Sequence, residues 1–135
     1  MAEIRLIATL AAPPRDVWNL IGGFNALPDW QPSVLASHLD EGGRVRRLSM
    51  ATGGTVVQEL LEEGDFFHSY SMSESPLPVT GYTATLGVGE GKNGACVLEW
   101  TSRFEPLGVG EEDAIASIKT LHERGIANLR RIFGK

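Results

Sequence analysis

The segment from residue 55 to residue 82 carries polar side chains at positions where a buried strand would carry apolar ones. Residues 55–62 alternate with period two, so we expect Val57, Glu59 and Leu61 to share the inward face of a strand. A carboxylate between two aliphatic side chains is costly to bury unless water or a counterion satisfies it. The pattern therefore favours a cavity with Glu59 in its wall.

Two chemistries are open to Glu59 in such a wall. Desolvation would raise the pKa of its carboxyl group, which suits a general base that works near neutral pH. The carboxylate could instead anchor a polar group of a ligand. The ordinary alternative is a carboxylate that is hydrated at the pocket wall or paired with Arg46 or Arg103.

The next strand repeats the alternation with aromatic and polar residues. Residues 66–72 place His68, Tyr70 and Met72 on one face, and Tyr82 follows in the strand after it. A few polar groups that converge in an apolar surround are typical of ligand sites. The alternative is a set of core aromatic residues whose hydroxyl groups find partners, with His68 near solvent at the start of its strand.

His122 lies in the middle of an otherwise apolar helical stripe. The stripe steps by three and four residues through Ile115, Ile118, His122, Gly125, Leu129 and Ile132. Its middle lacks side-chain volume, and we expect this gap to leave a cavity against a sheet. His122 is thus a candidate acid or base, and the alternative is a core or rim histidine.

Patterns typical of metal, nucleotide and hydrolase sites are missing from the sequence. No two histidines have metal-ligand spacing, and no glycine-rich loop stands between a strand and a helix. A Gly-x-Ser-x-Gly segment is also lacking. We therefore expect no metal and no cofactor.

Composition narrows the class of protein. The 135 residues are 42% apolar and carry a net charge of -5, which argues against nucleic-acid and anionic-membrane partners. We interpret the Arg44, Arg46 and Arg47 cluster as an exposed edge strand. A single cysteine suits a reducing compartment, and neither a signal peptide nor a membrane-spanning run is recognisable. We expect one cytoplasmic domain over residues 1–135, a monomer or homodimer without membrane insertion.

Turn residues divide the chain into elements. We expect a strand over residues 3–10, a short helix from Pro14 and a second short helix over residues 25–29. A long helix begins near Gly110. Between them, glycine-rich and proline-rich separators delimit six strands joined as antiparallel hairpins: 34–40, 44–51, 55–62, 66–74, 81–88 and 95–104.

Several segments, taken in order, resemble one superfamily. They are Val17-Trp-Asn-Leu-Ile-Gly-Gly-Phe, Leu27-Pro-Asp-Trp-Gln-Pro-Ser-Val, Glu59-Leu-Leu-Glu, Glu74-Ser-Pro-Leu-Pro-Val-Thr-Gly-Tyr and Trp100-Thr-Ser-Arg-Phe-Glu-Pro. The chain resembles the polyketide cyclase/dehydrase-like branch of the START/Bet v 1 superfamily (SRPBCC). The resemblance implies an α+β helix-grip fold, in which a curved antiparallel sheet of about seven strands surrounds a long C-terminal helix. It also implies an internal cavity for an apolar small molecule, such as a lipid or polyketide.

Two functions follow as hypotheses. The first is binding of a small hydrophobic or aromatic ligand between the sheet and the C-terminal helix, with loops 51–54 and 74–80 as lids. The second is a polyketide cyclase, dehydratase or isomerase in which Glu59 or His122 moves a proton. The expected ligand-binding residues are Trp30, Leu35, Val57, Glu59, Leu61, His68, Tyr70, Met72, Pro76, Leu77, Tyr82, Trp100, Ile118 and His122.

Overall fold

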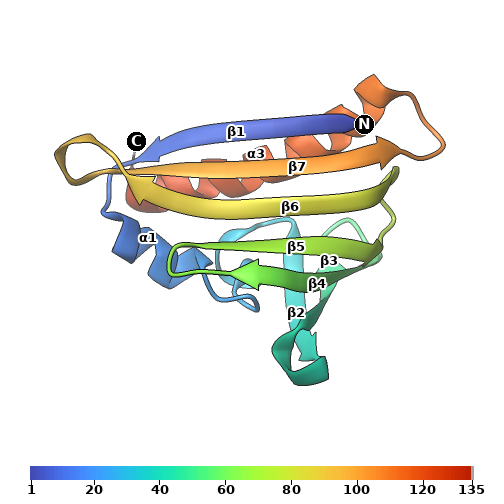
Figure 1. Ribbon diagram of the computed structural model, residues 1–135, viewed down its shortest axis with the longest axis horizontal. Coiled ribbons are helices and arrows are strands. Elements are labelled where there is room, and N and C mark those ends of the chain that lie inside the picture. Colours follow the sequence, from blue (N-terminus) through green and yellow to red (C-terminus); the bar gives the residue numbers. More distant parts are fainter. Residues whose placement is uncertain (135) are drawn as a thin grey trace.

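The computed structural model describes residues 1–134, which form one seven-stranded antiparallel sheet and a long helix (Figure 1). The strand order is β1-β7-β6-β5-β4-β3-β2. The strands are β1 (Ala2–Leu10), β2 (Val34–Asp40), β3 (Val45–Met50), β4 (Thr55–Glu63), β5 (Phe67–Glu74), β6 (Val79–Glu90) and β7 (Cys96–Pro106). The helices are α1 (Pro14–Ile21), α2 (Leu27–Trp30) and α3 (Glu111–Phe133), with 3-10 turns η1 (Glu41–Gly43) and η2 (Lys92–Gly94).

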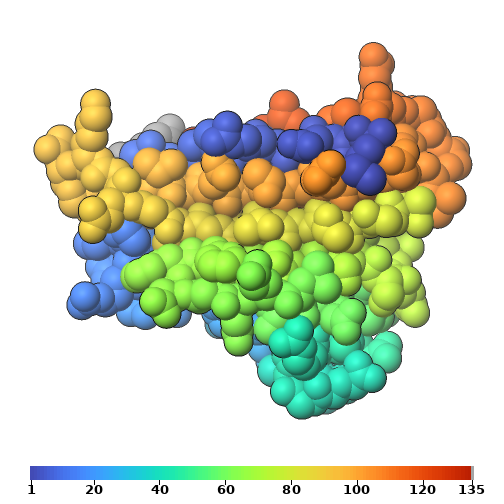
Figure 2. Space-filling model, in the orientation of Figure 1, coloured from blue at the N-terminus to red at the C-terminus, as the bar shows by residue number. Residues whose placement is uncertain are grey.

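Tight turns make β2 to β7 a run of sequential hairpins, as the glycine-rich separators predict. Gly42 has φ 69° in the turn between β2 and β3, and Gly53 has φ 95° in the turn between β3 and β4. Such left-handed conformations favour glycine because it lacks a Cβ atom. The η1 turn projects from the body at the bottom of Figure 2. Strand β1 pairs with β7, so the first and last strands of the chain lie side by side.

Helix α3 lies behind β1, β7 and β6 in Figure 1, on the inner face of the sheet. Its first turn is acidic and its last turn basic, which complements the helix dipole. The buried face consists of Ala114, Ile118, His122, Gly125, Ile126 and Leu129. The predicted stripe is therefore correct in its centre, whereas Ile115 is half-buried and Ile132 is 47% exposed, and Ala114 and Ile126 complete the buried face instead.

Two groups of buried apolar side chains fill the space between the sheet and the helices. One lies under α1 and α2 and includes Trp30 and Trp100. The other lies toward the start of α3 and includes Tyr70, Tyr82 and Ile118. No helix within residues 1–134 combines the length and apolarity that a membrane span requires. The architecture is the helix-grip fold that the sequence predicts.

Candidate functional site

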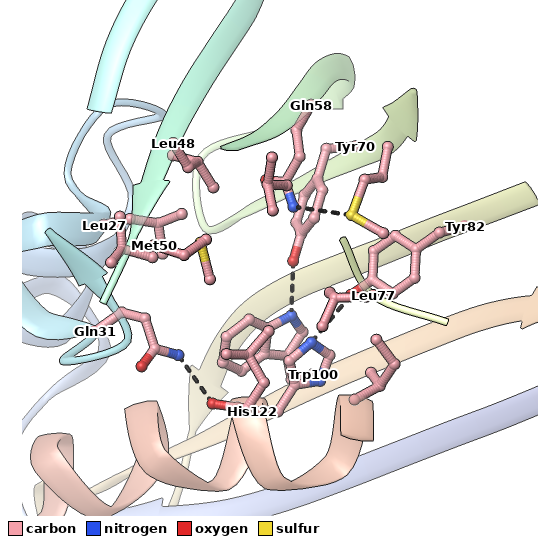
Figure 3. A pocket seen from close by; sticks show the side chains of 15 residues that line it. Leu27, Gln31, Leu48, Met50, Gln58, Tyr70, Leu77, Tyr82, Trp100 and His122 are labelled. Carbon is pink, nitrogen blue, oxygen red and sulfur yellow. Dashed lines mark hydrogen bonds between the residues drawn. The ribbon is translucent and has the colours of Figure 1, made fainter. Parts of the chain in front are cut away.

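A cavity of about 30 Å³ lies between the two buried groups, against the middle of α3 (Figure 3). This volume holds about two water molecules and is far smaller than a usual ligand pocket of ~300–1,000 Å³. Side chains thus fill most of the interior. Its wall consists of Leu27, Gln31, Val34, Leu48, Met50, Val56, Gln58, Tyr70, Met72, Leu77, Tyr82, Trp100, Ile118, Leu121 and His122.

His122 forms the floor of this cavity and is 2% exposed. Its imidazole ring stacks on Trp100, with ring centroids 3.9 Å apart and an angle of 10° between the planes. Its Nε2 lies 3.0 Å from the hydroxyl oxygen of Tyr82 (Figure 3). Burial lowers the pKa of His122 to about 3, so the ring is neutral near neutral pH. Its Nδ1 has no hydrogen-bond partner in the described part of the chain.

A second hydrogen bond links the sheet residues above this pair. Trp100 donates from Nε1 to the hydroxyl oxygen of Tyr70 over 3.1 Å. The rings of Tyr70 and Tyr82 lie 6.2 Å apart. Burial raises the pKa of Tyr70 and raises that of Tyr82 well above its ordinary value, so both hydroxyl groups keep their protons. The polar part of the cavity wall is therefore neutral.

Arg46 lies buried behind that wall, with 1% of its surface exposed. It donates from Nε to Gln58 Oε1 over 2.8 Å and from Nη1 to the carbonyl oxygen of Phe24 over 2.6 Å. Its guanidinium group lies 4.1 Å from the ring centre of Phe24 and 4.8 Å from that of Tyr70, which are cation–π distances. Burial lowers its pKa to about 10, which leaves it charged at neutral pH.

His68 belongs to the same buried layer as Arg46 and not to the cavity wall. Its ring packs between Trp18 and Phe24, and its Nδ1 lies 3.3 Å from the carbonyl oxygen of Gly22. Burial, and secondly the charge of Arg46, lower the pKa of His68 to about 4. His68 therefore anchors the end of α1 to the sheet.

Two loops meet at the surface beside the cavity. A Cβ atom at Gly54 would lie 3.1 Å from Cγ of Pro76, so the β3–β4 turn and the β5–β6 loop touch. Leu77 and Leu121 line the cavity and also an outer depression of about 370 Å³ that reaches Thr52. These two leucines therefore border both the cavity and the outer depression.

Residues 1–134 match the protein family described as polyketide cyclase / dehydrase and lipid transport. The chain belongs to this family. Among curated proteins, none matches the chain.

Solved structures show the same architecture as this polyketide cyclase/dehydrase family member. The protein XoxI from Bacillus cereus is 38% identical with a TM-score of 0.96, and the match covers 98% of this chain and 96% of that one. An uncharacterised protein from Bacillus thuringiensis is 36% identical with a TM-score of 0.95, over 99% and 100% of the two chains. The ZhuI aromatase/cyclase from a Streptomyces species is 17% identical with a TM-score of 0.73, over 94% and 87%, and shares the fold.

The predicted inward face of β4 is wrong. Glu59 is exposed and Leu61 is 48% exposed, and Val57 lines an outer depression together with Glu59. Both faces of this strand carry two aliphatic residues around a polar one, and the face that carries the amide of Gln58 is buried because an amide costs less to bury than a carboxylate. Glu59 is therefore excluded as a cavity base.

Other predicted site residues divide between the wall and positions away from it. Tyr70, Met72, Leu77, Tyr82, Trp100, Ile118 and His122 line the cavity. Leu35 is 66% exposed because β2 directs Val34 inward and has a register shift directly after it. Pro76 lies in the outer loop against Gly54, and Trp30 is buried against Trp100 and is not part of the cavity wall.

The gap at Gly125 does not create the expected cavity. A Cβ atom there would lie 2.7 Å from Nε2 of Gln31 and 2.9 Å from Cζ3 of Trp30, so these two side chains fill the space. Gln31 also donates to the carbonyl oxygen of Leu121 over 3.0 Å. The glycine thus lets α2 and the segment after it approach α3, and the cavity lies one turn earlier, at His122.

Arg46, Gln58 and Gln31 are among the buried polar residues that the sequence prediction missed. Arg46 shares strand parity with Leu48 and Met50, which line the cavity. That alternation predicts an inward arginine. The adjacent arginines Arg44 and Arg47 concealed this signal by suggesting an exposed basic cluster.

Proposed function

We propose that this protein binds a small apolar or aromatic molecule of lipid or polyketide type between the sheet and α3. Tyr70, Tyr82, Trp100 and His122 orient the polar group of the ligand, and apolar side chains provide the contact area. The observation that carries the proposal is the unpartnered Nδ1 of His122, fully buried beside an apolar-lined cavity. Buried polar atoms without partners are rare and often mark functional sites.

The small volume of the cavity implies that the ligand enters by displacing side chains. Leu77 and Leu121 stand between the cavity and the outer depression, and Met50 and Met72 line the inner wall. Methionine side chains readily change rotamer and re-pack around different shapes. The β5–β6 loop that carries Leu77 therefore acts as the lid, and the interior expands as the ligand enters.

Ligand titration tests the proposal. Native mass spectrometry of the purified protein, followed by calorimetric titration with fatty acids, naphthalene derivatives and aromatic polyketides, is expected to yield at least one 1:1 complex. Leu77→Ala is expected to accelerate ligand exchange, while Leu61→Ala on the outer face is the matched control. The absence of any complex across the whole panel would contradict the proposal.

A second candidate function is proton transfer on a polyketide-like substrate. The Tyr82–His122 hydrogen bond is the observation that favours it, because His122 could take a proton while Tyr82 donates to a developing enolate. The pKa of about 3 makes His122 a weak base near neutral pH, which is why binding ranks first. Cyclised or dehydrated product from wild type, and none from His122→Gln, would support catalysis.

We further propose that residues 1–135 act as one ligand-binding domain in the cytoplasm, without a nucleic-acid partner. The net charge of -5 supports the absence of a nucleic-acid partner, since phosphate binding needs a basic surface. We expect a monomer or a homodimer. Light scattering coupled to gel filtration measures the mass directly, and a larger assembly would contradict this proposal.

A further inference from the structure

The polar groups around the cavity carry more hydrogens than they have acceptors. Trp100, Tyr70, Tyr82 and His122 each bear one polar hydrogen, and two hydrogen bonds link them in pairs. A further hydrogen bond between the two tyrosine hydroxyl groups would raise the number of bonds among these four side chains to three, while they carry four polar hydrogens. One hydrogen therefore remains without an acceptor within this group.

The tautomer of His122 decides where the surplus hydrogen lies. If the proton sits on Nδ1, Tyr82 donates to Nε2 and the unpartnered Nδ1–H is the free donor. If the proton sits on Nε2, Tyr82 accepts, and the free hydrogen lies on one of the tyrosine hydroxyl groups. Both arrangements leave one donor without an acceptor among these four side chains, and an oxygen acceptor on a ligand would be complementary to it.

Gln58 adds a second donor in the same wall. Its Oε1 accepts from Arg46, so its amide nitrogen is the end directed toward Met72, whose sulfur lies 4.0 Å away (Figure 3). A thioether is a weak acceptor. The hydrogens of the Gln58 amide group are therefore available to a stronger acceptor that enters the cavity.

Arg46 places a positive charge directly behind these donors. No carboxylate within residues 1–134 forms an ion pair with it, and its partners are the neutral oxygens of Gln58 and Phe24 and two aromatic rings. A buried charge without a counterion destabilises the fold, and a nearby anion would stabilise it. The interior thus holds a positive charge without a counterion, next to hydrogen-bond donors that lack a strong acceptor.

We propose that the polar end of the ligand is an anionic oxygen group, a carboxylate on an otherwise apolar or aromatic molecule. The carboxylate accepts from Gln58 and from the Tyr70–Tyr82–His122 group, and Arg46 neutralises it from behind that wall. Arg46 acts through Gln58 and is a positioning residue. This inference rests on the proposed function and defines the chemical class of its ligand.

Pairs of matched ligands test the inference in the wild-type protein. The pairs are 2-naphthylacetic acid with 2-naphthylacetamide, and dodecanoic acid with dodecanamide, titrated calorimetrically at pH 7. The acid of at least one pair is expected to bind about tenfold more tightly than its amide, the scale of one charge-assisted hydrogen bond. Equal binding of acid and amide would overturn the inference and leave the proposed function intact.

Variants locate the source of the preference. Arg46→Met is expected to bring the acid-to-amide ratio close to one while amide binding is retained, and Gln58→Met provides a second test if Arg46→Met does not fold. Arg47→Met is the matched control, because Arg47 lies on the outer face of the same strand and pairs with Asp40. An equal loss of preference in Arg47→Met would overturn the inference. Binding of neither acid nor amide would contradict the proposed function itself, and the inference with it.

Discussion

His122 stacks face to face on Trp100, with 3.9 Å between the ring centroids, while its Nε2 meets the Tyr82 hydroxyl group 3.0 Å away. The stack covers one face of the imidazole, and the whole residue is only 2% exposed to solvent. Desolvation disfavours the charged form of histidine. A neutral, oriented imidazole is therefore built into the middle of α3.

The two buried histidines, His68 and His122, are expected to stay neutral near neutral pH. Burial lowers the pKa of His122 to about 3 and is the main reason that the pKa of His68 falls to about 4. Neither ring is expected to titrate between pH 5 and pH 8. Nitrogen-15 NMR of the imidazole groups measures this directly, and a midpoint near 6.5 for His122 would contradict the burial that the structure describes.

Acid stability follows from the same two groups. Their ordinary pKa of 6.5 exceeds the folded values, so the unfolded chain binds protons first as the pH falls. The contribution to stability is complete above pH 6.5 and is lost progressively toward pH 3, by a few kcal/mol. His122→Phe is expected to flatten this slope in urea titrations at several pH values. Ile118→Val, a neighbour that does not titrate, should lower stability and keep the slope.

The Tyr82 hydroxyl group is expected to stabilise the fold through His122. Tyr82→Phe leaves both imidazole nitrogens without a protein partner, which we expect to cost about 1–3 kcal/mol of unfolding free energy. Tyr70→Phe is the matched comparison, because it leaves the Trp100 indole N–H unpaired in the same way. Chemical denaturation measures both. A Tyr82→Phe variant as stable as wild type would show that the Tyr82–His122 bond contributes nothing.

Substitutions at the adjacent positions 58 and 59 are expected to affect stability to very different extents. Glu59 is exposed, so Glu59→Gln should change stability by less than about 0.5 kcal/mol. Gln58→Leu removes the acceptor of the buried Arg46 Nε and should cost about 1–3 kcal/mol. Thermal and urea unfolding of both variants measure these changes in stability. A large loss in Glu59→Gln would place that carboxylate inside after all.

Gly125 is expected to tolerate no larger residue, although it lies inside a helix. Gly125→Ala would gain about 0.5–1 kcal/mol of helix propensity. It would also force Cβ against the ring of Trp30 at 2.9 Å, and overpacking of this kind costs about 1–3 kcal/mol. We expect net destabilisation in urea. Gly89→Ala is the control, since nothing lies within 4 Å of that position, and a stabilised Gly125→Ala would show that Trp30 can move aside.

The sequence predicted the fold closely because its signals are local. Alternation delimits the strands, glycine-rich turns join them, and charged ends mark α3. The cavity residues on β5, β6, β7 and α3 followed from the same periodicity. Periodicity did not show which face of β4 points inward, since Val57 and Leu61 make the outer face as aliphatic as the inner one.

The sequence could not predict how side chains fill the interior, for a different reason. Gly125 predicts missing volume, but only the three-dimensional arrangement shows that Trp30 and Gln31 fill it. In the same way, Arg46 is buried because Gln58 on β4 and Phe24 after α1 meet its guanidinium group. Such partners lie far apart in the chain, so no local pattern indicates them.

The most direct test of the account is the indole N–H resonance of Trp100 in a proton–nitrogen NMR spectrum. Titration with 2-naphthylacetic acid and dodecanoic acid is expected to shift this signal together with Tyr82 and His122, while Glu59 on the outer face stays unchanged. A Trp100 signal that no ligand of the panel moves, or shifts confined to the outer face of the sheet, would contradict an interior binding site.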